Sequence, residues 1–220
     1  MFSVSSKGRL TVRDLGRFSG NTLFDRIARA VCEAGCLPRK ELYESWEMAR
    51  RIRRRLRGGR VVDLAAGHGL LSHILLLLDD SSPCALLVDT APPQAAARLH
   101  AVLAAAWPRL SGRIVCENRP LATVELASTD VVVSSHACGS LTDVVLNLAA
   151  SARARVAVLP CCHDLARNDA GSLSGWIESP LAIDVMRAVR LEQRGYHVRT
   201  QTIPEAVTPK NRLLIGEPRS

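Results

Sequence analysis

Short β-branched runs alternate with longer segments of helical periodicity through most of the chain. Strands are predicted at Arg60–Asp63, Ala85–Asp89, Arg113–Glu117, Asp130–Ser134 and Arg155–Leu159. Helices are predicted between them, at Leu70–Leu78, Pro93–Trp107 and Leu141–Ser151. Strands and helices that alternate in this way favour a doubly wound, mostly parallel sheet with right-handed crossover connections.

The pattern changes toward the C-terminus. After a predicted helix at Pro180–Gly195, two strand patterns at Tyr196–Ile203 and Arg212–Gly216 are separated only by a turn around Pro204–Pro209. Because this link is too short to hold a crossover helix, it predicts an antiparallel hairpin at the sheet edge. The fold class expected for the chain is therefore α/β and Rossmann-like, with an antiparallel C-terminal strand hairpin.

Helical periodicity also precedes the first strand. One helix is predicted to start at Asn21 and to end at Gly35, and a second to run from Arg39 to about Leu56. Gly58 and Gly59 then stop the second helix just before the sheet begins. We accordingly divide the chain into an N-terminal arm and helical extension, residues 1–58, and an α/β domain, residues 59–220.

The composition suits one α/β domain with a generous core, since the chain has 220 residues and 47% of them are hydrophobic. No apolar run approaches the ~20 residues of a membrane helix, so we expect no membrane association. The N-terminus has no signal-peptide pattern, and seven scattered cysteines suggest reduced thiols rather than a disulfide framework. Together these features favour a cytoplasmic protein. They predict no particular oligomeric state.

The formal net charge of +8 favours a polyanionic partner. Only three of the 29 basic residues are lysines, which is typical of a GC-rich genome, so local clustering is more informative than the total. Arginines crowd the end of the second predicted helix, and they indicate either a solvated helix end or a surface that binds RNA phosphates. The candidate RNA contacts are Arg50, Arg51, Arg53, Arg54, Arg55 and Arg57.

The most informative local segment is Val61–Gly69, with the sequence Val-Val-Asp-Leu-Ala-Ala-Gly-His-Gly. A β-branched run reaches Asp63, and a loop of small residues with Gly67 and Gly69 then opens a predicted helix. Glycines let a ligand approach the backbone closely, and the helix directs its first N–H groups at that ligand. The segment therefore predicts a nucleotide-like cofactor.

Two cofactors fit such a loop. The stretch Gly67–Ser72 partly matches the dinucleotide fingerprint G-x-G-x-x-G, and Asp89, 20 positions past Gly69, suits a ribose in either case. Asp63 distinguishes the two. A pyrophosphate would meet an unneeded negative charge there, whereas the ammonium of a methionine moiety is matched by a carboxylate. A glycine-rich turn without any ligand is the remaining alternative.

This segment resembles motif I of the class I S-adenosylmethionine (SAM) methyltransferases, with Ala65 where their first glycine often stands. The resemblance implies that SAM is the cofactor, that Asp63 and the loop of Ala65, Gly67 and Gly69 hold its methionine end, and that Asp89 binds the ribose hydroxyls. Glu117 and Asn118, which follow the third strand, would then lie near the adenine. The antiparallel C-terminal hairpin is also similar to that group.

Two further polar clusters end neighbouring predicted strands: Ser135–Gly139, which contains His136 and Cys138, and Pro160–Asp164, which contains Cys161, Cys162 and His163. Because the carboxyl ends of parallel strands meet at one edge of a sheet, we expect both clusters in one crevice. We predict catalytic roles for His136, Cys161 and His163.

Several chemistries remain open for these clusters. Residues at such strand ends often shape a pocket and orient a general base, and His136 or His163 is the expected base. A cysteine nucleophile and simple core packing are the alternatives. A zinc site is disfavoured because the spacing lacks C-x-x-C and because adjacent Cys161 and Cys162 would point in opposite directions on a strand. No metal ligand is therefore predicted.

The same clusters resemble the H-x-C-G and C-C-x-H signatures of one methyltransferase group, which includes the tRNA 2′-O-methyltransferases of the acceptor stem and related methyltransferase-like proteins. The similarity spans roughly Arg60–Pro218, although His163 follows Cys162 directly, one position early. It implies methyl transfer from SAM to an oxygen or nitrogen nucleophile, foremost in tRNA, and hence RNA modification. A protein or small-molecule acceptor, or a SAM- or RNA-binding module without catalysis, are the alternatives.

Overall fold

The computed structural model describes residues 2–219, so the outer limits of the two expected regions, Met1 and Ser220, lie outside it. Seven strands form one sheet in the order β3-β2-β1-β4-β5-β7-β6. The five parallel strands are β1 (Val61–Leu64), β2 (Ala85–Asp89), β3 (Ile114–Asn118), β4 (Val131–Ser134) and β5 (Arg155–Val158). The antiparallel pair is β6 (Tyr196–Thr202) and β7 (Arg212–Pro218), and β7 pairs with β5. The α/β fold with an antiparallel C-terminal hairpin is confirmed.

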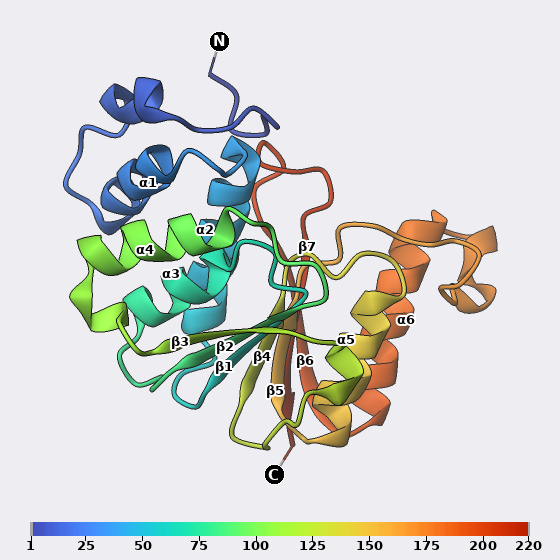
Figure 1. Cartoon of the computed structure of the whole chain (residues 1–220). Helices are drawn as coiled ribbons and strands as arrows, with labels where there is room; N and C mark the ends of the chain where they lie inside the picture. Colours follow the sequence, from blue (N-terminus) through green and yellow to red (C-terminus); the bar gives the residue numbers. More distant parts are fainter. Residues whose placement is uncertain (1, 220) are drawn as a thin grey trace.

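Six α-helices flank this sheet (Figure 1). They are α1 (Leu23–Ala34), α2 (Arg39–Arg53), α3 (Leu70–Leu78), α4 (Ala96–Ala106), α5 (Leu141–Ser151) and α6 (Ser179–Gln193). Four short 3₁₀-helices lie at Val12–Arg17, Pro108–Leu110, Leu121–Thr123 and Gly171–Gly175. The bounds of α3 and α5 coincide with the prediction. The predicted start of α4 at Pro93 was too early, because the backbone from Pro93 to Ala96 forms a turn instead.

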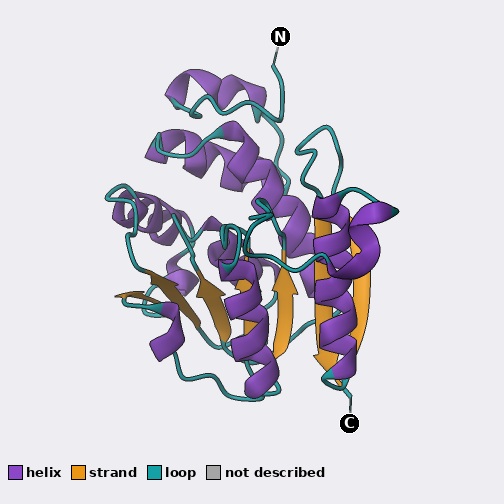
Figure 2. Ribbon diagram, turned by 90° about the vertical axis from the view of Figure 1, so that its right-hand side faces the viewer, coloured by secondary structure: helices purple, strands orange, loops and turns teal. Residues whose placement is uncertain are grey.

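The helices divide between the two faces of the sheet. Figure 1 shows α1–α4 on one side and α5 and α6 on the other, and Figure 2 views the molecule from the side of the latter pair. Each side has its own hydrophobic cluster of buried side chains. In Figure 2 the parallel strands point toward the end of the molecule where the N-terminal segment lies. The N-terminal segment is therefore close to the edge where ligands bind in this type of sheet.

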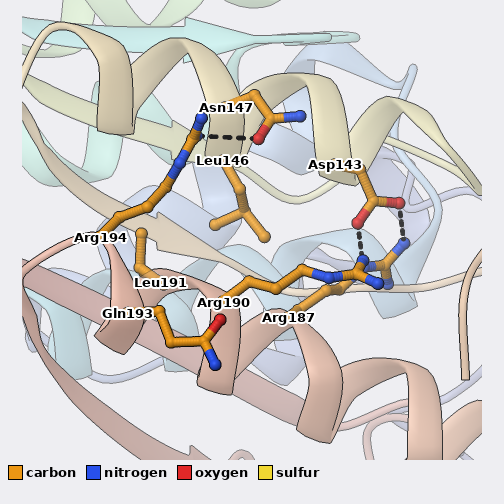
Figure 3. Close-up of a pocket in the computed structure, with 8 residues that line it drawn as sticks. All are labelled: Asp143, Leu146, Asn147, Arg187, Arg190, Leu191, Gln193 and Arg194. Atoms are coloured by element: carbon orange, nitrogen blue, oxygen red, sulfur yellow. Dashed lines mark hydrogen bonds and ion pairs between the residues drawn. The ribbon is translucent and has the colours of Figure 1, made fainter. Parts of the chain in front are cut away.

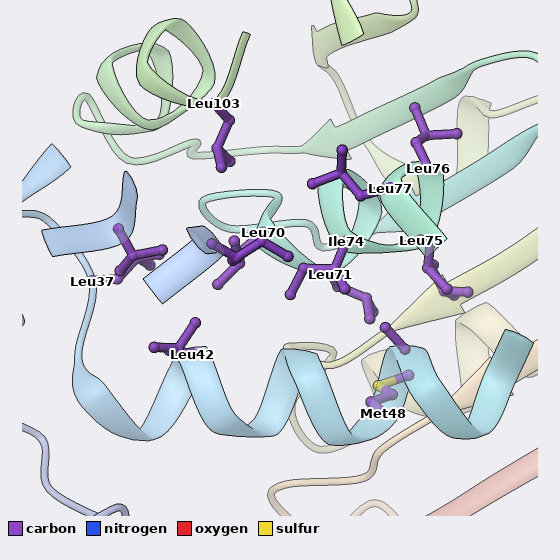
Figure 4. Packing of buried hydrophobic residues seen from close by; sticks show 14 of the residues in the cluster. Leu37, Leu42, Met48, Leu70, Leu71, Ile74, Leu75, Leu76, Leu77 and Leu103 are labelled. Carbon is purple, nitrogen blue, oxygen red and sulfur yellow. The ribbon is translucent and has the colours of Figure 1, made fainter. Parts of the chain in front are cut away.

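The N-terminal helices share one core with the α/β region. Helix α3 is almost entirely buried because it lies between the sheet and α2, and its leucines pack against Leu42 and Met48 of α2 (Figure 4). Helix α1 begins one residue after Thr22, which accepts a hydrogen bond from the Asp25 amide, so the cap is Thr22 and not Asn21 as the sequence suggested. No helix in residues 2–219 is long and apolar enough to cross a bilayer.

The C-terminal end of α2 is fixed by a buried arginine. The Arg53 side chain is 4% exposed, and it donates hydrogen bonds to the carbonyls of Leu56 and Leu75 and to the Ser82 hydroxyl. Its guanidinium also lies 3.4 Å from the Asp79 carboxylate. The prediction that Arg53 contacts RNA is corrected, since its side chain is buried and each of its three nitrogens has a partner inside the protein.

Candidate active site

The loop between β1 and α3 has an unusual backbone. Ala65, Gly67 and Gly69 all have positive φ angles, of 57°, 55° and 75°. A Cβ atom on Gly67 would lie 3.3 Å from the His136 ring, and one on Gly69 would lie 2.1 Å from Leu87 Cδ2. Both glycines are thus required by conformation and by space, whereas Ala65 adopts a left-handed conformation that costs about 1–2 kcal/mol. The loop brings main-chain atoms, and few side chains, to the carboxyl end of β1.

Asp63 lies directly below this loop and is 1% exposed. The Ser72 hydroxyl donates a hydrogen bond of 2.9 Å to Asp63 Oδ2, but Oδ1 has no partner among the described residues. Burial raises the pKa of Asp63 to about 7, despite the Ser72 hydrogen bond. A buried carboxylate oxygen without a partner is costly, and an ammonium group is the ligand that would best satisfy it.

Asp89 ends β2 and ties two loops together. Its Oδ2 accepts a hydrogen bond from the Gly67 amide, and its Oδ1 accepts one from the Ala91 amide, each at 2.9 Å. Asp89 also lines a cleft of about 430 Å³. The other residues around this cleft come from the ends of β1, β2 and β4, from the segment after β3 and from the start of α5: Ala65, Thr90, Pro120, Leu121, Ala122, His136, Leu141 and Val144.

Glu117 and Asn118 line a different hollow, of about 390 Å³, on the other side of Asp89. This hollow also contains Gly67, and Glu117 accepts a hydrogen bond of 2.6 Å from Arg119. The cleft that contains Ala65 and His136 is instead bordered by Pro120 and Leu121, a few residues further along the chain. The role of Glu117 and Asn118 near an adenine stays a prediction.

Glu41, in the first turn of α2, is a site residue that sequence analysis missed. Its Oε1 lies 3.3 Å from His68 Nδ1, in the glycine loop, and 3.5 Å from His136 Nε2, at the end of β4. Burial raises the pKa of Glu41, but hydrogen bonds from both histidines outweigh it and lower the pKa to about 2. No local pattern marks this glutamate, because only the packing of α2 on α3 brings it over the loop.

His136 faces the cleft from the carboxyl end of β4, and its side chain is 36% exposed. Burial lowers its pKa, yet the hydrogen bond and charge of Glu41, with a smaller effect of Asp63, raise the pKa above the ordinary histidine value. His136 therefore combines access to the cleft with a carboxylate that stabilises its protonated form.

The three cysteines of the two clusters lie together. Cys138 Sγ is 3.1 Å from Cys161 Sγ, and the sulfur atoms of Cys138, Cys161 and Cys162 all lie within 4.8 Å of one another. The sequence analysis expected the two clusters in one crevice, but its argument against a zinc site treated Cys161 and Cys162 as strand residues, although β5 ends at Val158. Cys161 and Cys162 lie beyond the strand, so its alternation of side chains does not apply to them.

His163 occupies a different environment from His136. Its side chain is 4% exposed, and its Nε2 lies 2.8 Å from Asp184 Oδ1 on α6. Asp184 also accepts hydrogen bonds from Arg187 and Arg212. This arrangement favours a positioning role for His163, because its Nε2 is committed to the Asp184 carboxylate inside the protein.

Arg187 connects α6 to the loop that carries Cys138. Its guanidinium donates to both carboxylate oxygens of Asp143, on α5, and to the Gly139 carbonyl. Figure 3 shows the Arg187–Asp143 pair beside a hollow of about 320 Å³ between α5 and α6. Through its bond to the Gly139 carbonyl, the pair holds the loop after β4 in place.

The exposed arginines lie at the end of α2 and in the residues that follow it, away from this site. Arg50, in the last turn of α2, is exposed and pairs with Glu47 at 3.4 Å. Arg51 bonds to Glu47 and to the Thr202 carbonyl, whereas Arg54, Arg55 and Arg57, here called the arginine surface, are exposed. Glu41 and Arg54 occupy opposite ends of α2, about 20 Å apart at 1.5 Å per residue. An RNA bound both at the cleft and at the arginine surface would have to span this distance.

Comparison with known proteins identifies the family. The model of the methyltransferase domain family matches residues 40–169, more than half of the chain. The chain therefore belongs to the methyltransferase domain family, for which SAM is the cofactor. The orphaned oxygen of Asp63, the open backbone of the glycine loop and Asp89 at the end of β2 fit that cofactor.

Individual relatives are distant. The glutathione S-transferase C-terminal domain-containing protein of Xenopus laevis is 26% identical over an aligned length of 127 residues, covering 41% of this chain. The chain spans only 21% of that protein. An O-methyltransferase family protein from Burkholderia thailandensis is 20% identical with a TM-score of 0.55, covering 98% of this chain and 65% of the other. The SAM-dependent methyltransferase SibL is 18% identical with a TM-score of 0.53, and the match covers 97% of this chain and 67% of the other. These structures share the fold.

Proposed function

We propose that this methyltransferase modifies RNA, foremost tRNA, at an oxygen or nitrogen nucleophile, with His136 as the proton acceptor. The observation that carries the proposal is the Glu41–His136 pair, whose histidine lines the same cleft as Asp89. An oxygen or ring-nitrogen nucleophile that gains a methyl group must lose a proton, and a histidine is suited to accept it near neutral pH.

The cofactor end of the site follows from the contacts described above. Asp63 Oδ1 would take the ammonium group of the methionine moiety, and Asp89 would accept hydrogen bonds from the ribose hydroxyls. Bound SAM supplies an electrophilic sulfonium methyl group. The protein then has to align the nucleophile with that group, because SAM is reactive by itself.

On the acceptor side, neutral His136 would take the proton from the nucleophile through Nδ1, because its Nε2 faces the Glu41 carboxylate at 3.5 Å. Glu41, whose depressed pKa keeps it ionised, would stabilise the imidazolium that forms, as the acid of a catalytic triad does. His68 Nδ1 contacts the same oxygen of Glu41, Oε1, at 3.3 Å and so helps to hold the carboxylate over the glycine loop.

RNA as the acceptor is supported by charge. The net charge is +8, and the arginine surface leaves three guanidinium groups exposed to phosphates. On the acceptor side, Lys210 lies beside Cys162. A polyanion that reached both regions would gain affinity from each.

The test is methyl transfer from labelled SAM into a fractionated cell extract, with RNase and protease digestion of the products. We expect RNase-sensitive label, and we expect His136→Ala to lower turnover by ~10²–10⁴ without loss of cofactor affinity. The matched control is His197→Ala, at an exposed histidine on β6. Label confined to protein or to small molecules refutes the RNA proposal, and full turnover in the His136 variant refutes the base assignment.

A further inference from the structure

The cluster of three thiols beside the cleft is independent of the methyl-transfer proposal. Cys138 comes from the loop after β4, and Cys161 and Cys162 come from the loop after β5. In residues 2–219 this is the one group of three metal-ligating side chains whose ligand atoms lie so close together. Among the described residues, the sulfur atoms of this group make hydrogen-bond contacts only with one another and, from Cys162, with Lys210.

The distances suit a small cation bound by sulfur. In a tetrahedral zinc site with Zn–S bonds of about 2.3 Å, neighbouring sulfur atoms are separated by about 3.8 Å. This value lies between the 3.1 Å contact of Cys138 with Cys161 and the 4.8 Å that encloses all three sulfur atoms. Small side-chain rotations are therefore enough to place three sulfurs around one cation.

The two loops are held together without the cation. The Gly139 amide donates to the Cys162 carbonyl at 3.2 Å, and Arg187 donates to the Gly139 carbonyl at 3.0 Å. His163, next to Cys162, is fixed to Asp184. The backbone thus presents the thiols to one another in advance, which lowers the ordering cost of binding a metal.

Charge also favours a divalent cation at this point. Three thiolates around a divalent ion leave one net negative charge, and the Lys210 ammonium, 3.7 Å from Cys162 Sγ, would balance it. Soft thiolate ligands select zinc over magnesium or calcium. Cys138 is exposed, so the fourth ligand position faces solvent and is open to water.

We propose that Cys138, Cys161 and Cys162 form a zinc site with three thiolate ligands, which joins the loops after β4 and β5. Binding would release up to three protons to solvent as the thiols become thiolates, and no electron is transferred. The bound ion would hold the wall of the cleft that carries His136, two residues before the first ligand.

The test is a titration of the full chain with cobalt(II), after reduction with a phosphine and removal of metals. Tetrahedral cobalt bound by thiolates gives near-ultraviolet charge-transfer bands and visible ligand-field bands, and we expect saturation at about one equivalent per chain. Zinc should then displace the cobalt. Cys138→Ser, Cys161→Ser and Cys162→Ser should each lose this stoichiometric binding, while Cys116→Ser, at an exposed thiol on β3, should retain it.

Two results would overturn the proposal. One is the absence of cobalt–thiolate bands in reduced wild-type protein whose circular dichroism spectrum shows that it is still folded. This result overturns the proposal even if the same thiols form a disulfide in air. The other is retention of the bands in all three serine variants. The band intensity grows with the number of thiolates, so the wild-type spectrum alone tests the site if a serine variant fails to fold.

Discussion

Proton uptake by Asp63 should control how tightly the cofactor binds. The cofactor ammonium requires an ionised carboxylate, but burial raises the pKa of Asp63 to about 7, so the free protein holds a proton there below that pH. Binding must expel this proton. The affinity should therefore be highest above pH 7 and should be lost as the pH falls through about 7.

The size of the effect follows from the pKa. With a value of about 7 in the free protein and a fully ionised Asp63 in the complex, affinity should drop about tenfold between pH 8 and pH 6. Proton release on binding should be about 0.9 per site at pH 6 and about 0.1 at pH 8. The charged groups near Asp63 are His136, Asp89 and Glu41, so the same measurement on His136→Gln separates the histidine contribution.

Calorimetry with S-adenosylhomocysteine measures both quantities, because this demethylated product keeps the ammonium group. Titrations in two buffers of different ionisation enthalpy give the number of protons released. In Asp63→Asn, which can still accept the Ser72 hydrogen bond, the affinity should be lower at pH 8 and no longer fall toward pH 6. Asp80→Asn, at an exposed aspartate, is the matched control. A wild-type pH dependence in Asp63→Asn would refute the reasoning.

Three further results are expected. Glu41→Gln should lower the apparent pKa of the rising limb of kcat against pH, because neutral His136 is the active form and loses the carboxylate that raises its pKa; an unchanged limb would exclude the pair. Gly69→Ala should destabilise the protein by about 1–3 kcal/mol in urea unfolding, since the new Cβ meets Leu87 at a positive φ; wild-type stability would contradict this geometry. Glutamine at all three positions of the arginine surface should reduce the salt dependence of tRNA binding and leave cofactor binding unchanged; an equal salt slope would argue for solvated arginines alone.

Much of the fold could be predicted from local sequence. The bounds of α3 and α5 and of β2 match their predicted ranges because apolar periodicity, glycines and turns act within a few residues of each element. The antiparallel hairpin was predictable for a similar reason, since a short link between β6 and β7 leaves no other pairing.

The glycine loop was also visible in the sequence. Asp63, Gly67, Gly69 and Asp89 lie in one strand–loop–helix–strand unit, so their relative positions follow from a connection of standard geometry. The structure places the four residues together, and the Gly67–Asp89 hydrogen bond joins the two strand ends. Their roles toward SAM stay predictions that the binding experiments test.

The sequence by itself thus determined the order of elements, the sheet and the loop that suits the cofactor, all of which depend on contacts between near neighbours. Only the tertiary structure decided which distant side chains meet. Packing of α2 on α3 brings Glu41 to His68 and His136 and buries Arg53. The loop that follows β5 brings Cys161 and Cys162 to Cys138. Such contacts depend on how whole elements pack, and no local pattern encodes that packing.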